Sequence, residues 1–269
     1  MKLIRFIIYG NILVSLSVGS LTFGTSIFQQ LDHSILYGVC SFFATLFIYN
    51  LQRLMRFEDV KTQDSNRHRW IIQHKTSLIS LSAIGLFGAT TTYLFLGIGK
   101  DYILLGALTI LGFLYAYQIK GKSAVREIPF LKIYLIAVVW TLVTVFWPSY
   151  REEMLGINII FLITSLGFYI IAATIPFDIR DLLYDHSSQK TIPQLVGVNG
   201  SKWIGIVLLI ISAFLLFMTN SLFYQNPLSY LAYIGMGILI LYSHNRRPEM
   251  YFSGLIDGWI IFFGLQFLL

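Results

Sequence analysis

The sequence contains few charged residues. Asp, Glu, Lys and Arg make up 12% of its 269 residues, whereas 56% are hydrophobic and 16% are aromatic. A soluble domain averages about 25% charged residues. This composition therefore argues against an ordinary soluble fold and favours a protein that lies in a lipid bilayer.

Cysteine is nearly absent, and the patterns of several common sites are missing. Cys40 is the only cysteine, so no intrachain disulfide can form. The five histidines are scattered without HExxH or any paired spacing, which argues against a zinc site. No GxxxxGK phosphate loop is present either. The compartment must therefore be inferred from charge rather than from redox chemistry.

Long apolar runs dominate the chain. A helix needs about 20 apolar residues to cross a hydrocarbon layer of about 30 Å. We expect nine such helices, which form an all-α membrane bundle in a single transmembrane domain over residues 1–269. The predicted spans are 5–27, 33–52, 77–98, 101–118, 130–148, 155–177, 203–223, 228–243 and 252–268. The first run is longer than the core of a signal peptide, so we expect it to be retained.

The positive charges divide unevenly between the two sides of this predicted bundle. If the N-terminus is cytoplasmic, seventeen of the 19 lysines and arginines lie on the inner side, and only Lys100 and Arg151 lie outside. This distribution predicts an integral protein of the inner (cytoplasmic) membrane with its N-terminus in the cytoplasm and its C-terminus outside. Anchoring to anionic membrane lipids explains most of these residues without catalysis. We expect no nucleic-acid partner.

A cluster of acidic residues follows the sixth run, in DIRDLLYDHSSQKTIPQLVG, residues 178–197. Asp178, Asp181 and Asp185 have the spacing i, i+3, i+7, which places them on one helical face. Their carboxylates repel one another unless a cation holds them. Mg²⁺ suits such a face because it takes one or two carboxylates together with water and substrate phosphate. Alternatively, the stretch is a solvated helix end with Arg180 and Lys190 as local partners.

The same stretch resembles the second Asp-rich motif of the UbiA superfamily of intramembrane prenyltransferases. In that motif, N/D-x-R/K-D-x-x-x-D is followed by a basic residue, Thr-[Leu/Ile]-Pro and a glycine. The matching residues here are Asp178, Arg180, Asp181, Asp185, Lys190, Thr191, Ile192, Pro193 and Gly197. Nine spans and the sequence LIDG at residues 255–258 agree with the family as well. Specific residues are matched in only about a tenth of the chain.

The resemblance implies transfer of a prenyl group from a prenyl diphosphate to a lipophilic, often aromatic, acceptor within the membrane. It implies Mg²⁺ as the cofactor that neutralises the departing diphosphate. The residues carried over as metal ligands are Asp178, Asp181, Asp185 and Glu58, with Asp181 and Asp185 as the catalytic pair. The residues carried over as substrate contacts are Asn50, Arg53, Lys120, Arg126, Arg180 and Lys190, of which Lys120 and Arg126 lie in a basic loop that resembles the family's.

The first Asp-rich motif of the family is degenerate here. It reads roughly N-D-x-x-D-x-x-x-D, whereas residues 50–58 read NLQRLMRFE. Asn50 matches and Glu58 stands in place of the third aspartate, but leucines replace the first two. Arg53 lies three residues beyond Asn50, so we expect both to face one cavity, where Arg53 would supply charge in place of a first Mg²⁺. Alternatively, Arg53 and Arg56 only anchor the inner end of the helix.

Two other functions remain open. With half of the first motif missing, the chain could be a non-catalytic UbiA-like protein that binds isoprenoids or assists assembly. A transporter would usually carry polar groups near the bilayer midplane, and ionisable residues are almost absent from these runs. Asp257, inside the ninth run, could either bind substrate or hydrogen-bond to a neighbouring helix.

Overall fold

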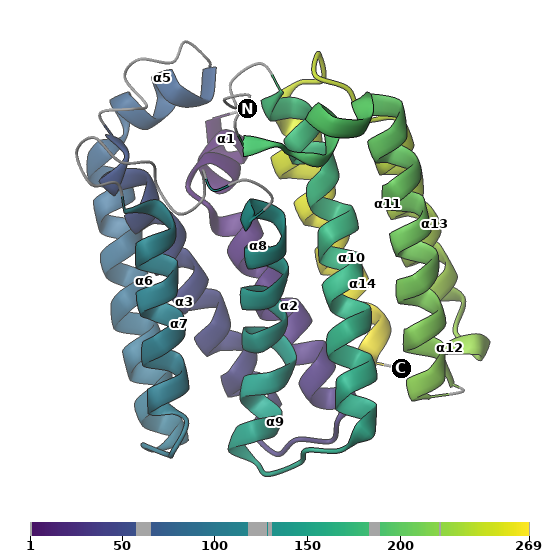
Figure 1. Ribbon diagram of the computed structural model, residues 1–269. Helices are drawn as coiled ribbons and strands as arrows, with labels where there is room; N and C mark the ends of the chain where they lie inside the picture. The colour runs from purple at the N-terminus through teal and green to yellow at the C-terminus, as the bar shows by residue number, and fades with distance from the viewer. Residues whose placement is uncertain are drawn as a thin grey trace.

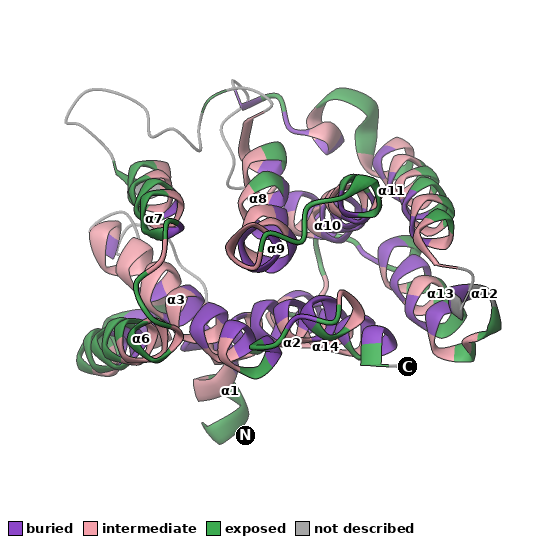
Figure 2. Cartoon of the chain, turned by 90° about the horizontal axis from the view of Figure 1, so that it is seen from below, coloured by how far each residue is buried: buried purple, intermediate pink, exposed green. Residues whose placement is uncertain are grey.

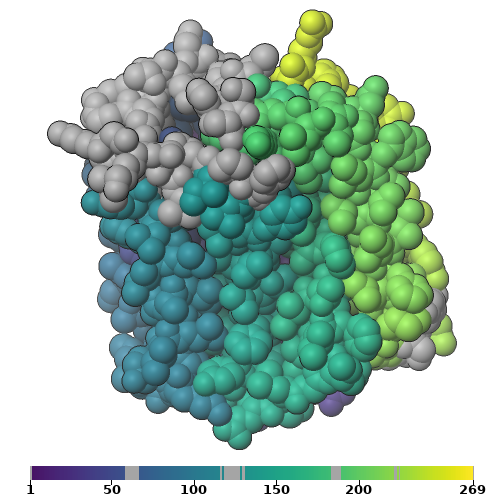
Figure 3. Space-filling model, viewed as in Figure 1, coloured from purple at the N-terminus to yellow at the C-terminus, as the bar shows by residue number. Residues whose placement is uncertain are grey.

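The computed structural model describes residues 2–57, 66–117, 128, 131–182, 189–220 and 222–268. This part of the chain is helical and contains no strand. Figure 1 shows the long helices side by side as an upright bundle, with the N-terminus and α5 at its upper end. In the space-filling view of Figure 3, segments 75–116, 131–181 and 192–241 follow one another across the same face.

The helices are joined by short connections at the lower end of the bundle. Their bounds are α1 Lys2–Tyr9, α2 Ile12–Phe28, α3 Ser34–Met55, α5 Asn66–Gln73, α6 Lys75–Leu96, α7 Tyr102–Ala116, α8 Leu131–Thr141, α9 Trp147–Arg151, α10 Ile157–Asp181, α11 Ile192–Thr219, α12 Leu222–Gln225, α13 Pro227–Leu241 and α14 Asp257–Leu265. Two π-helical segments, Leu142–Phe146 and Tyr251–Ile256, precede α9 and α14, and a 3₁₀ turn, Gln266–Leu268, follows α14.

The predicted all-α membrane bundle is confirmed, but the count of nine complete crossings is not. Six helical stretches of the described residues are long and apolar enough to cross a membrane, and the bent pair α1–α2 makes a seventh if it counts as one span. The other two predicted runs coincide with α7 and α13, which are apolar but shorter. Every predicted run therefore corresponds to a helix, although not every helix has full spanning length.

The outer surface of the bundle is apolar, as contact with lipid requires. Figure 2 shows exposed residues on the outer sides of α6, α7, α11 and α13, whereas buried residues dominate α2 and α10. Large apolar side chains are among the exposed ones, including Phe87, Phe95, Ile103, Trp203 and Ile210. Lipid-facing surfaces of this kind support placement in a membrane.

The first predicted span is a broken helix rather than a continuous one. The axes of α1 and α2 differ by 60°, and Asn11 at the break has a left-handed backbone with φ 61°. Asn50 Nδ2 donates to the Gly10 carbonyl at 3.1 Å and Asn11 Nδ2 donates to Asn50 Oδ1 at 3.1 Å, while Arg53 donates to the Tyr9 carbonyl. These contacts satisfy polar groups that a break would otherwise leave unpaired inside the bilayer.

Helix α11 begins eleven residues before the predicted start at residue 203. Thr191 is its N-cap, and the Thr191 N–H donates to Gln194 Oε1 at 3.0 Å. Pro193 lies in the first turn, where its missing N–H costs nothing. Gly197 then bends the helix with φ 74° and ψ 170°, a conformation that favours glycine. Thr191, Pro193 and Gly197, which match the second Asp-rich motif of the family, therefore begin and bend α11.

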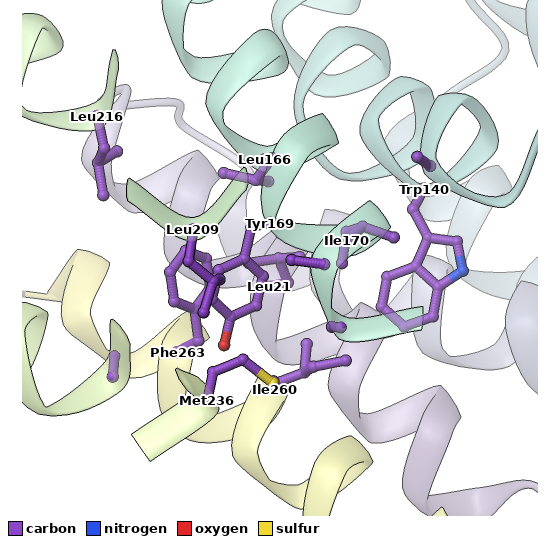
Figure 4. Close-up of a cluster of buried hydrophobic side chains, with 14 of the residues drawn as sticks. Leu21, Trp140, Leu166, Tyr169, Ile170, Leu209, Leu216, Met236, Ile260 and Phe263 are labelled. Carbon is purple, nitrogen blue, oxygen red and sulfur yellow. The ribbon is translucent and has the colours of Figure 1, made fainter. Parts of the chain in front are cut away.

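Tight packing fixes the last helix against α2. Tyr169 on α10 stacks on Phe263 of α14 with ring centroids 3.6 Å apart, and Figure 4 shows both beside Leu21 and Met236. A Cβ atom on Gly24 would lie 2.3 Å from the Gly264 carbonyl oxygen, so only glycine allows this approach of α2 and α14. Small residues at helix contacts are the usual means of close packing in membranes.

A buried ion pair holds the lower end of the bundle together. Asp101, which is fully buried, accepts hydrogen bonds from Arg151 Nη1 at 2.6 Å and from Trp147 Nε1 at 2.7 Å. Arg151 Nη2 also donates to the Leu96 and Gly97 carbonyls, both at 2.5 Å. Burial raises the pKa of Asp101, but the hydrogen bonds from Trp147 and Arg151 outweigh it and leave the pKa below its usual value. Arg151 is thus a structural residue.

We expect Asp101→Asn to destabilise the fold strongly, because it leaves the Arg151 guanidinium without its carboxylate. Loss of one partner of a buried pair costs about 3–5 kcal/mol. The measurement is the thermal unfolding midpoint of the purified protein in detergent. Lys100→Gln is the control, since Lys100 pairs with Glu153 at 2.5 Å but both are solvent-exposed. Equal unfolding midpoints for the two variants would contradict the stabilising role of the Asp101–Arg151 pair.

Candidate functional site

A cavity of about 1150 Å³ lies inside the bundle and extends along the helices. Its lining includes Arg53 and Cys40, which are thirteen residues apart on α3, so it spans about 20 Å along that helix. On α8 and α9 the lining extends in the same way from Lys132 to Trp147. The cavity therefore reaches from the upper end of the bundle to the buried ion pair at its lower end.

The lower part of the cavity is lined mostly by apolar side chains. We call this region the apolar body; its lining includes Ala44, Ile48, Leu105, Leu108, Ile136, Val139, Trp140, Val143, Ile170 and Ala173. An elongated space with such walls suits a hydrocarbon chain, because burial of apolar surface is favourable.

Charged residues gather at the upper end of the cavity. We call this region the ionic mouth; its described residues are Arg53, Arg56, Arg67, Lys132, Asp178, Arg180, Asp181, Arg247 and Glu249. They comprise six cations and three carboxylates, so the described mouth has a surplus of positive charge. An excess of positive charge in a partly desolvated site attracts an anion.

Arg180 is the centre of the ionic mouth. Its Nε and Nη2 donate to the two oxygens of Asp181 at 2.7 and 3.0 Å, and its Nη1 donates to Glu249 Oε1 at 3.1 Å. Glu249 also accepts a hydrogen bond from Arg67 Nη1 at 2.9 Å. Burial raises the pKa of Glu249, but Arg180 and Arg67 outweigh it and hold the pKa below its usual value. Glu249 is therefore ionised at neutral pH.

Lys132 connects the two aspartates of α10. Its Nζ lies 2.9 Å from Asp178 Oδ1 and 3.6 Å from Asp181 Oδ2. Both carboxylates therefore lie at the cavity and are already paired with cations. Lys132 and Arg67 are among the seventeen positive charges predicted on the inner side, and Glu249 was not singled out from the sequence, because nothing in their local sequence shows which helix ends meet in space.

Arg53 differs from the other arginines of this network. Its Nη1 donates to the Tyr9 carbonyl, and no carboxylate in the described part of the chain pairs with it. It nevertheless lines the ionic mouth. A guanidinium keeps its charge when desolvated and can bind phosphate oxygens in a bidentate manner. Arg53 is thus available to an anionic ligand.

Several predicted site residues have other positions. The expectation that Asn50 faces the cavity with Arg53 is wrong, because Asn50 is fully buried and donates to the Gly10 carbonyl at the helix break. A backbone carbonyl exposed by a break inside the bilayer needs such a donor. Lys190 is exposed and borders only a small neighbouring pocket. Four predicted residues lie outside the described part of the chain: Glu58, Lys120, Arg126 and Asp185.

Asp178 and Asp181 are the described residues that could hold a divalent cation. They supply two carboxylates at the cavity, a number that Mg²⁺ commonly takes when substrate phosphate and water complete its shell. The described residues include no group of three or more metal-binding side chains. A resident all-protein metal cage is therefore not present within residues 2–57, 66–117, 131–182, 189–220 and 222–268, whereas a site shared with a phosphate remains compatible with the donors.

Comparison with known proteins gives one structural relationship. The sequence matches no protein-family model and no curated protein. The structure is similar to the apo structure of a UbiA homolog from Aeropyrum pernix K1, with a TM-score of 0.66 over 94% of this chain and 97% of that chain. The chain has the UbiA fold. Because the two sequences are only 11% identical, this similarity extends to the fold and confirms the resemblance at that level.

We expect Arg53→Gln to weaken the binding of inorganic pyrophosphate at least about tenfold, because a charge-assisted hydrogen bond contributes about 1.5–3 kcal/mol. Isothermal titration of the purified protein measures the affinity. Arg246→Gln is the matched control, since Arg246 is an exposed arginine near the same end that does not line the cavity. The thermal unfolding midpoint of Arg53→Gln is measured as well. A midpoint close to that of wild type shows that the α1–α2 break is intact and that the weaker binding comes from loss of the guanidinium. Equal affinity in all three proteins would contradict the role of Arg53.

Proposed function

We propose that this protein transfers a prenyl group from a prenyl diphosphate to a lipophilic acceptor within the membrane, in a Mg²⁺-dependent reaction. The observation that supports this proposal is the continuity between the ionic mouth and the apolar body within one cavity, which spans about 20 Å along α3. Such a cavity accommodates a ligand with an anionic head and a long hydrocarbon tail. The UbiA fold supports the same class of reaction.

Each part of the cavity has a role in this proposal. Arg53, Arg180 and Lys132 would stabilise the negative charge that develops on the leaving diphosphate, because fixed cations in a partly desolvated site act strongly on such charge. The apolar body would enclose the chain and exclude water that could quench the allylic cation.

In the same proposal, Asp178 and Asp181 would hold Mg²⁺ together with the phosphate oxygens of the substrate. When bound, Mg²⁺ would add positive charge against the departing pyrophosphate. Lys132 and Arg180 now pair with these carboxylates, so metal binding requires those contacts to loosen. Asp185 and Glu58 are further candidate ligands outside the described residues.

A second function is favoured by those same ion pairs. Because Asp178 and Asp181 are already neutralised by Lys132 and Arg180, the chain could bind a prenyl diphosphate without a metal and without turnover. If the protein has this non-catalytic function, its affinity for a prenyl diphosphate should not depend on Mg²⁺.

Pyrophosphate release distinguishes the two functions. Purified protein is incubated with Mg²⁺, prenyl diphosphates of several chain lengths, and phenolic and lipid acceptors. We expect release that falls at least about 100-fold in Asp181→Asn, because removal of one charge-stabilising group at an active site costs 10²–10³-fold, and that stops when EDTA removes the metal. Glu153→Gln, at the exposed lower end, is the control and should behave as wild type. Binding without release at any chain length would favour the non-catalytic function, and absence of binding would contradict both.

We further propose that the ionic mouth faces the cytoplasm, because the cation-rich end of a membrane protein normally does. Single cysteines introduced into a Cys40→Ser background test this orientation. A membrane-impermeant maleimide added to intact cells should label Glu153→Cys and leave Arg246→Cys unlabelled until the cells are lysed. The reverse pattern would place the mouth outside.

A further inference from the structure

Asp257 is a buried carboxylate that the functions assigned above do not use. It is the first residue of α14, is 8% exposed, and lines the cavity. Within the described part of the chain its carboxylate forms no hydrogen bond or ion pair. An ionisable residue inside a membrane span is costly, and those that occur usually serve a site.

The packing of α14 explains why this carboxylate faces the cavity. Ser17 Oγ donates to the backbone carbonyl of Asp257 at 2.7 Å, so the contact with α2 uses the main chain and leaves the side chain to the cavity. The π-helical segment Tyr251–Ile256 directly precedes Asp257. Such segments shift the register of the side chains that follow and recur at functional sites. Of the two roles that the sequence left open for Asp257, interhelical hydrogen bonding by its side chain is not observed among the described residues.

Asp257 lies between the ionic mouth and the apolar body. It follows Glu249 of the mouth by eight residues, which places it about 10 Å farther into the bundle. It remains within electrostatic reach of Arg53, Arg67 and Arg180. A prenyl diphosphate with its head in the mouth and its tail in the body would have its reactive first carbon at this level.

Tyr49 on α3 is a second polar group at this level of the cavity. Like Asp257 it lines the cavity, and it precedes Arg53 of the ionic mouth by four residues on α3. Trp140 Nε1 donates to Tyr49 Oη at 3.1 Å, so the tyrosine accepts this hydrogen bond and its own proton remains available to a ligand. Tyr49 and Asp257 thus offer one donor and one acceptor to a group that enters between the mouth and the body.

We propose that Asp257 and Tyr49 form the acceptor site, in which Tyr49 orients a hydroxyl group of the acceptor and Asp257 takes the proton that the acceptor loses on prenylation. This inference rests on the proposed prenyl transfer and deepens it, since it assigns the positioning and the deprotonation of a hydroxyl-bearing acceptor to two side chains of this chain. A cationic amine is disfavoured because the charges around Asp257 are the three arginines Arg53, Arg67 and Arg180 against one further carboxylate, Glu249.

The reaction balances with these groups. The bond between the first prenyl carbon and the diphosphate oxygen breaks, and its electron pair leaves with pyrophosphate. A new bond joins that carbon to the acceptor, either at the hydroxyl oxygen or at a ring carbon that the hydroxyl activates. The proton displaced from the acceptor moves to the Asp257 carboxylate and then leaves to solvent through the ionic mouth. A positioned base contributes about 10²–10⁴-fold to such a step.

Asp257→Asn tests the base directly, because it preserves the shape of the side chain and removes its basicity. We expect kcat for prenyl transfer to a phenolic acceptor to fall at least about 100-fold, with the dissociation constant for the prenyl diphosphate changed less than twofold. Asp257→Glu should recover part of the rate, which a purely structural role would not predict. An unfolding midpoint close to that of wild type guards against misfolding.

Tyr49→Phe tests the orienting role. We expect KM for the acceptor to rise about tenfold with a smaller change in kcat, as loss of one hydrogen bond to a bound hydroxyl predicts. Tyr169→Phe is the matched control, because Tyr169 is fully buried and does not line the cavity.

The outcomes separate this inference from the function on which it rests. Transfer by wild type that is unchanged in Asp257→Asn would overturn the acceptor site and leave the proposed function standing. No transfer by wild type with any acceptor would overturn the proposed function and the acceptor site together. Transfer to an amine in preference to the matching phenol would overturn the assigned acceptor class.

Discussion

The interaction between Arg180 and its two carboxylate partners determines the character of the site. Arg180 bridges Asp181, in its own helix, and Glu249, which precedes α14, and it lies over the rings of Phe177 and Phe252. The pairing offsets part of the cost of placing charge at the edge of the bilayer. It also fixes the ends of two helices that are distant in sequence, so that the cations around the mouth converge on one cavity.

The departures from the family pattern acquire a physical meaning in this structure. Where two aspartates are expected on α3, the chain has leucines, and Arg53 binds the Tyr9 carbonyl at the helix break while it lines the ionic mouth. One arginine therefore stabilises the broken first helix and supplies charge to the cavity. The α3 side of the ionic mouth can therefore be electropositive without a metal. The α10 side differs, because it carries the carboxylates Asp178 and Asp181.

Much of the architecture could be predicted from sequence because hydropathy reports directly on lipid contact. It located a helix for every apolar run and placed Asp178 and Asp181 at a helix end. It did not predict the break at Gly10 and Asn11, because an apolar run reads alike whether the helix is straight or bent. Asn50 was expected to face the cavity because spacing gives the face of a helix but not which neighbour covers it.

The central claim is that the ionic mouth and the apolar body together bind an amphiphile with a diphosphate head. Comparison of a prenyl diphosphate with the prenyl alcohol of equal chain length measures the contribution of the head alone, by titration in the same detergent. We expect the diphosphate to bind at least about 100-fold more tightly than the alcohol, a difference of about 2.7 kcal/mol in binding free energy. Added salt should reduce this difference in affinity. Equal affinities at low salt would contradict the central claim.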